Sequence, residues 1–203
     1  ADGAGWSWGY GGQGLLGHGD EQSQLLPKKL EAFAGQRVVA VSAGGHHNLA
    51  RTDDGAVFGW GEGRHGCLGH GGDLFNQPLP TNFEAFAGQR VVAVSAGLHH
   101  SLAITADGAV WSWGYGAYGR LGHGDEQNQL LPKKTDAFAD QRAVTVSAGA
   151  YHSFALTADG AVWSWGWGAF GKLGHGDEQR QWQPKKVEAL AGQRVVAVTA
   201  GGV

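Results

Sequence analysis

The sequence predicts an all-β protein made of about four repeats, each with three to four short antiparallel strands. An aromatic, glycine-rich motif that ends in Leu-Gly-His-Gly begins at Trp6, Phe58, Trp111 and Trp163, so its copies lie 52 or 53 residues apart. Glycine contributes 37 of the 203 residues and proline only 5, which is typical of many tight turns between short strands. No segment has the pattern of a helix of normal length.

The first two strands of each repeat follow from apolar, β-branched runs. The run over 91–97 predicts one strand, with equivalents at 38–44, 144–149 and 195–201. The segment 99–105 predicts the next strand, because His100, Leu102 and Ile104 fall on one face while the residues between them fall on the other.

An Asp-Gly pair follows these two strands and predicts a hairpin. The pair at 107–108 recurs at 2–3, 54–55 and 159–160. Asp-Gly is typical of a type I′ turn, which needs positive φ at both central residues. The strand after the turn, 109–113, is expected to carry Trp111 and Trp113 on one face.

The repeat then closes with a loop and a proline-containing segment. Residues 122–129 read as a long loop, and 130–134 contain Pro132. Since proline cannot donate a hydrogen bond to a sheet, this segment is expected to be an outer edge strand or a covering loop. Three or four short strands in one repeat are the content of one β-propeller blade.

The full repeat resembles a known family. The pattern V-V-A-V-S-A-G-x-H-H-S-L-A-I-T-x-D-G-x-V-W-S-W-G-x-G-x-x-G-x-L-G-H-G-D, followed by proline, is similar to the regulator of chromosome condensation repeat and covers essentially the whole chain. The resemblance implies a β-propeller with blades of about 50 residues, usually seven in a closed ring.

The chain reads as one repeat array over 1–203, with units at roughly 1–37, 38–90, 91–142 and 143–194, and with 195–203 beginning a further inner strand. Four blades of this family cannot close a seven-bladed ring. We therefore expect a fragment of a longer propeller, a ring completed by two copies that pair through their terminal strands, or a compact small ring, and favour the first two. The sequence contains no methionine, which fits a processed chain or a fragment.

Composition excludes several classes of partner. The formal net charge is −3 and no basic cluster appears, so nothing supports binding of nucleic acid by this segment or of a membrane surface. No stretch of 18 apolar residues occurs. The single cysteine, Cys67, rules out an internal disulfide and fits a reducing compartment, so we expect an intracellular location, nuclear or cytoplasmic.

Ten histidines raise the question of a metal site, and we favour a structural role. His47, His100 and His152 occupy equivalent strand positions some fifty residues apart, in different blades. The neighbours His46 and His99 should point to the opposite face of each strand. We expect the three equivalent histidines to be buried and bonded to backbone between blades, with Trp60, Trp113 and Trp165 as further packing residues, and no metal or cofactor.

Motifs for catalysis are equally unsupported. Gly-x-Gly-x-x-Gly at 114–119 resembles a dinucleotide fingerprint, but the Leu-Gly-His-Gly that follows cannot open the required helix. The adjacent acids Asp125 and Glu126 are not an acid/base pair held at a working distance, and no Ser-His-Asp or Cys-His arrangement appears. We therefore predict that the chain is not an enzyme.

The informative positions are those that vary between repeats on the loops. When the four repeats are aligned, three columns of equivalent loop positions differ in residue type from repeat to repeat. The first column is Tyr10, Glu62, Tyr115 and Trp167, the second is Gln13, His65, Tyr118 and Phe170, and the third is Leu15, Cys67, Arg120 and Lys172. In repeat proteins, fixed positions carry packing while variable surface positions can carry recognition. The second repeat is the outlier, because it has Arg51 where its siblings have Ile104 and Leu156.

We expect the surface around Arg51, Glu62, Arg64 and Phe75 to be the most specialised. The candidate partner-binding residues are Tyr10, Arg51, Glu62, Arg64, His65, Phe75, Tyr115, Tyr118, Trp167 and Phe170.

The leading functional hypothesis is a non-catalytic protein-interaction module, a role that the resemblance implies for many family members. One alternative is guanine-nucleotide exchange on a Ran-like small GTPase with chromatin association, although the wedge insertion and basic arm of such members are not visible. A second is a relative of the plant UV-B photoreceptor. The sensing motif Gly-Trp-Arg-His-Thr of that protein reads Gly45-His46-His47-Asn48 here, without tryptophan or arginine, so no sensing residue carries over.

Overall fold

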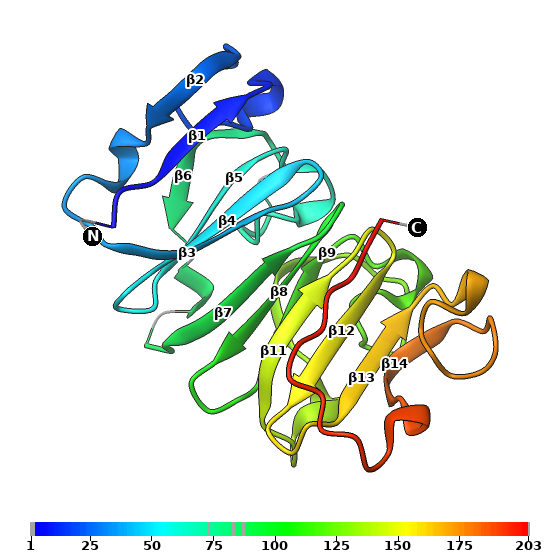
Figure 1. The fold of residues 1–203 in the computed structure, drawn as a ribbon. Helices are drawn as coiled ribbons and strands as arrows, with labels where there is room; N and C mark the ends of the chain where they lie inside the picture. Colours follow the sequence, from blue (N-terminus) through cyan, green and yellow to red (C-terminus); the bar gives the residue numbers. More distant parts are fainter. Residues whose placement is uncertain (1–2, 73, 83, 87, 203) are drawn as a thin grey trace.

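The computed structural model describes residues 3–72, 74–82, 84–86 and 88–202. Its strands form four antiparallel sheets that follow one another along the chain (Figure 1). We name them the part blade, blade A, blade B and blade C.

The part blade pairs β1 (Trp6–Gly9) with β2 (Gln24–Lys29). Each full blade has four strands in chain order. Blade A contains β3 (Val38–Ala43), β4 (His47–Thr52), β5 (Val57–Gly61) and β6 (Gln77–Asn82). Blade B contains β7 (Val91–Ala96), β8 (His100–Thr105), β9 (Val110–Gly114) and β10 (Gln129–Lys134). Blade C contains β11 (Ala143–Ala148), β12 (His152–Thr157), β13 (Val162–Gly166) and β14 (Gln181–Lys186).

Helical structure in the described residues is limited to short 3₁₀ turns at two places in each repeat. One follows the tryptophan strand: η1 (Gly12–Gly14), η3 (Arg64–Gly66), η5 (Ala117–Gly119) and η7 (Ala169–Gly171). The other follows the outer strand: η2 (Glu31–Phe33), η4 (Glu84–Phe86), η6 (Asp136–Phe138) and η8 (Glu188–Leu190). The prediction of an all-β chain with blades of three to four strands is confirmed.

The Asp-Gly hairpins at 54–55, 107–108 and 159–160 form, but with a different turn, and Asp2 of the pair at 2–3 lies outside the described residues. Gly108 has a φ of 87°, whereas Asp107 is not among the residues with positive φ, so the type I′ prediction is wrong. The carboxylate of Asp107 accepts hydrogen bonds from the Thr105 hydroxyl (2.6 Å) and the Ala109 amide (3.2 Å). An aspartate that bonds its own backbone in this way stabilises an Asx-type turn, in which only the glycine needs positive φ.

The proline segments are edge strands, as predicted. β2, β6, β10 and β14 each lie at the outer edge of their sheet. In blade B the pairing register shifts between Gln129 and Lys133, around Pro132, because proline has no amide hydrogen to give to β9.

Apolar side chains pack between successive blades rather than in one central core. Leu102 and Ile104 of blade B pack with Ala143 and Trp165 of blade C and with Phe138 of η6. The ring of Phe138 meets those of Trp163 and Trp165 at centroid distances of 5.5 and 5.9 Å. Phe33 and Phe86 make the same contacts with the aromatic residues of blades A and B. Each of these phenylalanines therefore packs on the blade that its own segment leads into.

A repeated set of hydrogen bonds crosses between neighbouring blades, and we call it the seam. His47 Nε2 of blade A lies 2.7 Å from Ser101 Oγ of blade B, and that hydroxyl donates to the Cys67 carbonyl at 2.8 Å. The same bonds join His100 to Ser153 at 2.8 Å between blades B and C. The partner of His47 and of His100 is thus a serine hydroxyl of the next blade, not backbone as expected.

The seam also contains the buried tryptophans. Trp113 Nε1 donates to the Cys67 carbonyl of the preceding repeat at 2.9 Å, and Trp165 Nε1 donates to the Arg120 carbonyl at 2.8 Å. Trp60 makes the equivalent bond to Leu15 at 3.0 Å. A glycine ends each inner strand because the blades approach closely there. A Cβ atom on Gly97 would lie 2.5 Å from the Gly149 carbonyl oxygen.

The two ends of the arc differ from its middle. Trp8 of the part blade is 59% exposed, whereas its equivalent Trp113 is fully buried in blade B. At the other end, residues 191–202 have no strand assignment, although an inner strand was expected from 195. This segment still crosses blade C as an inner strand would, since Ala200 N donates to Ser147 Oγ and Ala150 N donates to the Gly201 carbonyl (Figure 1). The repeat boundaries stay a prediction.

Candidate functional site

The variable loop residues gather along one end of the blades, which we call the rim. It consists of side chains that precede the second strand or follow the third strand of each blade: His46, Glu62, His65, His99, Tyr115, Tyr118, Arg120, Tyr151, Trp167, Phe170 and Lys172. Two halves of the rim differ in chemistry. One half is rich in histidine, and the other combines cations with aromatic rings.

The backbone of the rim is the same in each full blade. The amide of Glu62 donates to the His46 carbonyl at 2.8 Å. In blades B and C the equivalent bonds join Tyr115 to His99 and Trp167 to Tyr151, at 2.9 and 3.0 Å. The chain therefore holds six side-chain positions in fixed relation while their identities change from blade to blade.

The second variable column has an unusual backbone conformation. His65, Tyr118 and Phe170 have φ values of 61°, 63° and 62°. The left-handed region is uncommon for residues other than glycine, and bulky side chains rarely adopt it. Such conformations cluster at functional sites, where the surroundings hold them in place.

The third variable column is less exposed than the sequence interpretation assumed. Cys67 and Arg120 are buried, Leu15 and Lys172 are half-buried, and the carbonyl groups of Cys67 and Arg120 accept the seam hydrogen bonds described above. Burial also raises the pKa of the Cys67 thiol to about 12, so this cysteine stays protonated at neutral pH.

Arg120 is the centre of the aromatic half. Its Nε and Nη1 atoms donate to the carbonyl groups of Ala117 (2.9 Å) and Ala150 (2.7 Å). The guanidinium carbon lies 4.9, 5.5 and 5.1 Å from the ring centroids of Tyr115, Tyr118 and Tyr151. Burial lowers the pKa of Arg120, and an arginine in a protein still carries its charge. The three rings therefore hold a buried cation.

Trp167 continues this half towards the end of blade C. Its ring lies 5.7 Å from that of Tyr118 and 5.3 Å from that of Tyr151. Lys172 places its Nζ atom 4.1 Å from the Trp167 ring centroid, a cation–π contact. Burial lowers the pKa of Lys172 from its ordinary value.

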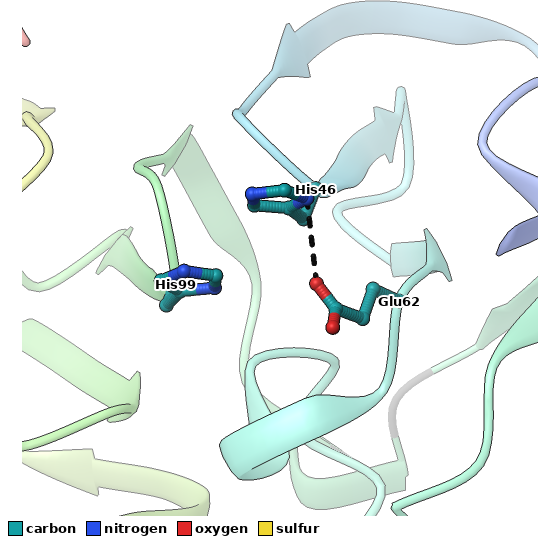
Figure 2. Close-up of side chains that lie close together, drawn as sticks. All are labelled: His46, Glu62 and His99. Carbon is teal, nitrogen blue, oxygen red and sulfur yellow. Dashed lines mark ion pairs between the residues drawn. The ribbon is translucent and has the colours of Figure 1, made fainter. Parts of the chain in front are cut away.

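The histidine half lies over blades A and B. The rings of His46 and His99 are stacked, with centroids 4.7 Å apart and planes at 2°. His65 stacks on Tyr115 at 4.2 Å and meets His99 edge-on at 5.8 Å, which links the two halves. Glu62 Oε2 lies 3.4 Å from His46 Nδ1 (Figure 2). Burial, and then the neighbouring His46, lower the pKa of His99 to about 4.

The structure brings most of the predicted partner-binding residues together. Ring, cation–π and ion-pair contacts through the rim join seven of them: Glu62, Arg64, His65, Tyr115, Tyr118, Trp167 and Phe170. Arg51 is not among them. It pairs with Val57 at the far end of β4, near Arg90, and its Nη1 donates to the Thr52 carbonyl at 3.3 Å. Tyr10 and Phe75 are exposed on the outer loops of the part blade and blade A.

Sequence reasoning did not select five rim residues: His46, His99, Tyr151, Arg120 and Lys172. The first three form a column that varies directly before the buried histidine of each blade, which is the signal that could have found them. The fifty-residue separation of the histidines was a poor argument against proximity, because adjacent blades bring equivalent positions side by side.

Comparisons with known proteins identify the family. The profile of the RCC1-like domain matches residues 1–203. The ultraviolet-B receptor UVR8 of Arabidopsis thaliana is 38% identical over 195 residues, which are 96% of this chain and 44% of the receptor. The human E3 ubiquitin-protein ligase HERC2 is 39% identical over an alignment of 205 positions, which covers the whole of this chain and 4% of the ligase.

A solved structure supports the same assignment. The crystal structure of Prp20p from Saccharomyces cerevisiae matches with a TM-score of 0.83 and 26% identity, over 97% of this chain and 49% of Prp20p. The chain thus spans about half or less of each of these relatives. Among the residues that the structure describes, no helix has the length and apolar character to cross a membrane. The chain belongs to the RCC1-like domain family.

Proposed function

We propose that this chain is a non-catalytic protein-interaction module that binds its partner with the rim. The observation that carries the proposal is the unbroken series of ring and cation contacts from His46 to Lys172, made by side chains that vary while their backbone does not. Aromatic residues and arginine are the usual centres of binding energy at protein interfaces. The nuclear or cytoplasmic location of the chain stays a prediction.

The aromatic half favours a partner segment with acidic side chains. Arg120 Nη2 and Lys172 Nζ are buried atoms without a hydrogen-bond partner among the described residues. No carboxylate in the described part of the chain forms an ion pair with either residue. A buried cation without an anion is costly, and a carboxylate from a partner would offset that cost.

A peptide-display selection tests this proposal. Random peptides are selected on the wild-type chain and counter-screened on the double variant Trp167→Ala/Lys172→Gln. We expect enrichment of aspartate and glutamate beside apolar residues, and loss of binding to the double variant. Arg142→Gln is the matched control, because Arg142 is an exposed arginine beside the Asp-Gly turn of blade B, away from the rim, and its side chain donates to the Ala106 carbonyl at 3.2 Å. Selected peptides without acidic enrichment, or with equal affinity for the double variant, would contradict the proposal.

We also propose that the part blade associates with blade strands of a second copy. A cavity of about 240 Å³ lies beside β1 and is lined by Trp8, Val41 and Trp60, among others. In blades B and C, inner strands cover the equivalent tryptophans. Light scattering during gel filtration tests this: about twice the chain mass of 21.2 kDa supports pairing, and a monomer at micromolar concentration contradicts it.

Guanine-nucleotide exchange on a Ran-like GTPase is the second candidate. It is favoured by the 26% identity to Prp20p, which is described as having binding properties to Gsp1p and histones. Release of a fluorescent nucleotide from purified Gsp1p, accelerated by this chain, would support it. A response to UV-B, suggested by the 38% identity to UVR8, would require that irradiation change the oligomeric mass.

A further inference from the structure

The histidine half of the rim brings together three side chains with metal-binding atoms. His46, Glu62 and His99 each offer one ligand atom, and these atoms all lie within 4.8 Å of one another. His46 and Glu62 come from blade A and His99 from blade B (Figure 2). His99 Nδ1 is a buried atom without a hydrogen-bond partner in the described residues. We propose that His46, Glu62 and His99 form a binding site for a divalent transition metal ion, Zn²⁺ in particular, that joins blade A to blade B.

The charge on Glu62 supports a cation at this place. Its side chain is only 9% exposed, and its two ion-pair contacts are long, at 3.4 Å to His46 and 3.6 Å to Arg64. Charge-assisted hydrogen bonds are usually about 2.7–2.9 Å long. Arg64 is largely exposed, so it offsets little of the cost of burying the carboxylate. A bound dication would compensate this charge directly.

The neighbouring blades provide an internal comparison. The positions of His46 and Glu62 are occupied by His99 and Tyr115 in blade B and by Tyr151 and Trp167 in blade C. Among the described residues, only the junction of blades A and B therefore combines two imidazoles with a carboxylate. The backbone bonds that fix these positions are the same in all three blades, so the ligand set is a change of side chains alone.

The donor atoms indicate the class of metal. Two imidazole nitrogens and one carboxylate oxygen suit zinc and its neighbours, with a fourth position left for water or a partner side chain. Neutral imidazole is the ligating form, so binding should weaken as the pH falls and the two imidazoles take up protons.

Binding requires a modest local rearrangement. Tetrahedral zinc holds its ligands about 3.3 Å apart, so the three atoms must close by roughly 1.5 Å at most. The stacked rings are parallel, and a ring nitrogen binds metal in the plane of its ring. At least one imidazole must therefore turn, and His46, whose side chain is 39% exposed, has the room to do so.

Isothermal titration of the chain with ZnCl₂, after treatment with EDTA, tests the proposal. We expect one ion per chain and a loss of affinity of about tenfold or more in His46→Phe, Glu62→Gln and His99→Phe. Phenylalanine keeps a ring in the stack, and thermal melts in EDTA verify that each variant folds. His65→Phe is the matched control, because His65 contacts His99 but lies outside the ligand set.

Two further results decide the matter. Zinc should raise the melting temperature of the wild type and the control but not of the three ligand variants. In imidazole ¹⁵N spectra, the signals of His46 and His99 should shift on addition of zinc. The absence of saturable 1:1 binding, or equal affinity in the control and the ligand variants, would overturn the assignment.

Discussion

The seam and the rim are adjacent regions of the same blades that follow opposite rules. In the seam, the same histidine, serine and tryptophan recur and make the same bonds between blades A and B and between blades B and C. In the rim, only the backbone bonds recur. The pair of side chains that they hold changes from His46 and Glu62 in blade A to His99 and Tyr115 in blade B, and to Tyr151 and Trp167 in blade C. The difference shows that the residues that stabilise the fold and the residues that vary on the rim lie within a few positions of one another on the same strand.

Arg120 lies where the two regions meet. Its carbonyl accepts two seam bonds, from Ser153 and Trp165, while its side chain is the centre of the aromatic half of the rim. A single residue can thus be invariant in its backbone role and variable in its side chain. The same holds for Cys67 in blade A, whose carbonyl bonds Ser101 and Trp113.

Acid should lower the free energy of unfolding through the buried histidines of the seam, and this is the largest effect that we expect. Burial lowers the pKa of His47 to about 3 and that of His152 to about 4, from an ordinary value of 6.5. Between the folded and the unfolded pKa, only the unfolded chain binds a proton at each of these histidines. Their contribution to the free energy of unfolding is therefore fully present above pH 6.5 and is lost as the pH falls towards 4. Each such histidine contributes a slope of up to about 1.4 kcal/mol per pH unit.

Urea unfolding at half-unit steps from pH 7.5 to 4 measures this slope. His152→Gln should reduce the slope of the free energy of unfolding against pH by the contribution of one histidine, up to about 1.4 kcal/mol per pH unit. A free energy of unfolding that is independent of pH from 7 to 4.5 would show that the seam histidines do not stay neutral in the fold.

Paired tryptophan substitutions contrast the two regions directly. Trp165→Ala removes a fully buried ring and its bond to the Arg120 carbonyl, which should cost about 3–5 kcal/mol. Trp167→Ala, two residues away on the rim, should cost about 1 kcal/mol or less. Chemical denaturation of both variants measures the difference, and equal losses would break the separation of stability from recognition.

Ser101→Ala tests the polar part of the seam. The change leaves His47 Nε2 without its 2.7 Å partner and removes a bond to the Cys67 carbonyl. Leaving a buried polar atom unpaired costs about 1–3 kcal/mol. The matched rim change Tyr118→Phe keeps the ring contacts and should be nearly neutral. A neutral Ser101→Ala would mean that the serine contacts contribute little to joining the blades.

Exchange of rim side chains should have the smallest effect on stability. Glu62→Tyr gives blade A the residue that blade B has at the equivalent position, Tyr115, on the same backbone bond. We expect a melting temperature within a few degrees of the wild type and no zinc binding. A collapse of the fold would show that the Glu62 side chain belongs to the framework.

The sequence predicted the framework well because repetition carries it. A proline in each outer strand and a glycine at each Asp-Gly turn are local signals, which β10 and Gly108 illustrate, and the fixed spacing of the copies repeats them along the chain. The turn type was missed because it depends on two competing local hydrogen bonds, which Asp107 accepts from Thr105 and Ala109 and which change which residue needs positive φ.

The candidate site was predicted only in part, because single-sequence patterns order residues along a strand and not across blades. Variation identified Tyr115, Tyr118 and Trp167, which the structure joins. It did not place Arg51, which pairing with Val57 sets at the other end of β4. It also could not reveal that Arg120 is buried among rings from two blades.

The affinity of one display-selected acidic peptide, measured by fluorescence anisotropy, tests the central claim most directly. The account predicts equal affinity for the wild type and Arg142→Gln, and at least about tenfold weaker binding to Trp167→Ala/Lys172→Gln, a loss of about 1.4 kcal/mol. Unchanged affinity in that double variant, with an intact melting temperature, would contradict the claim that the rim is the binding surface.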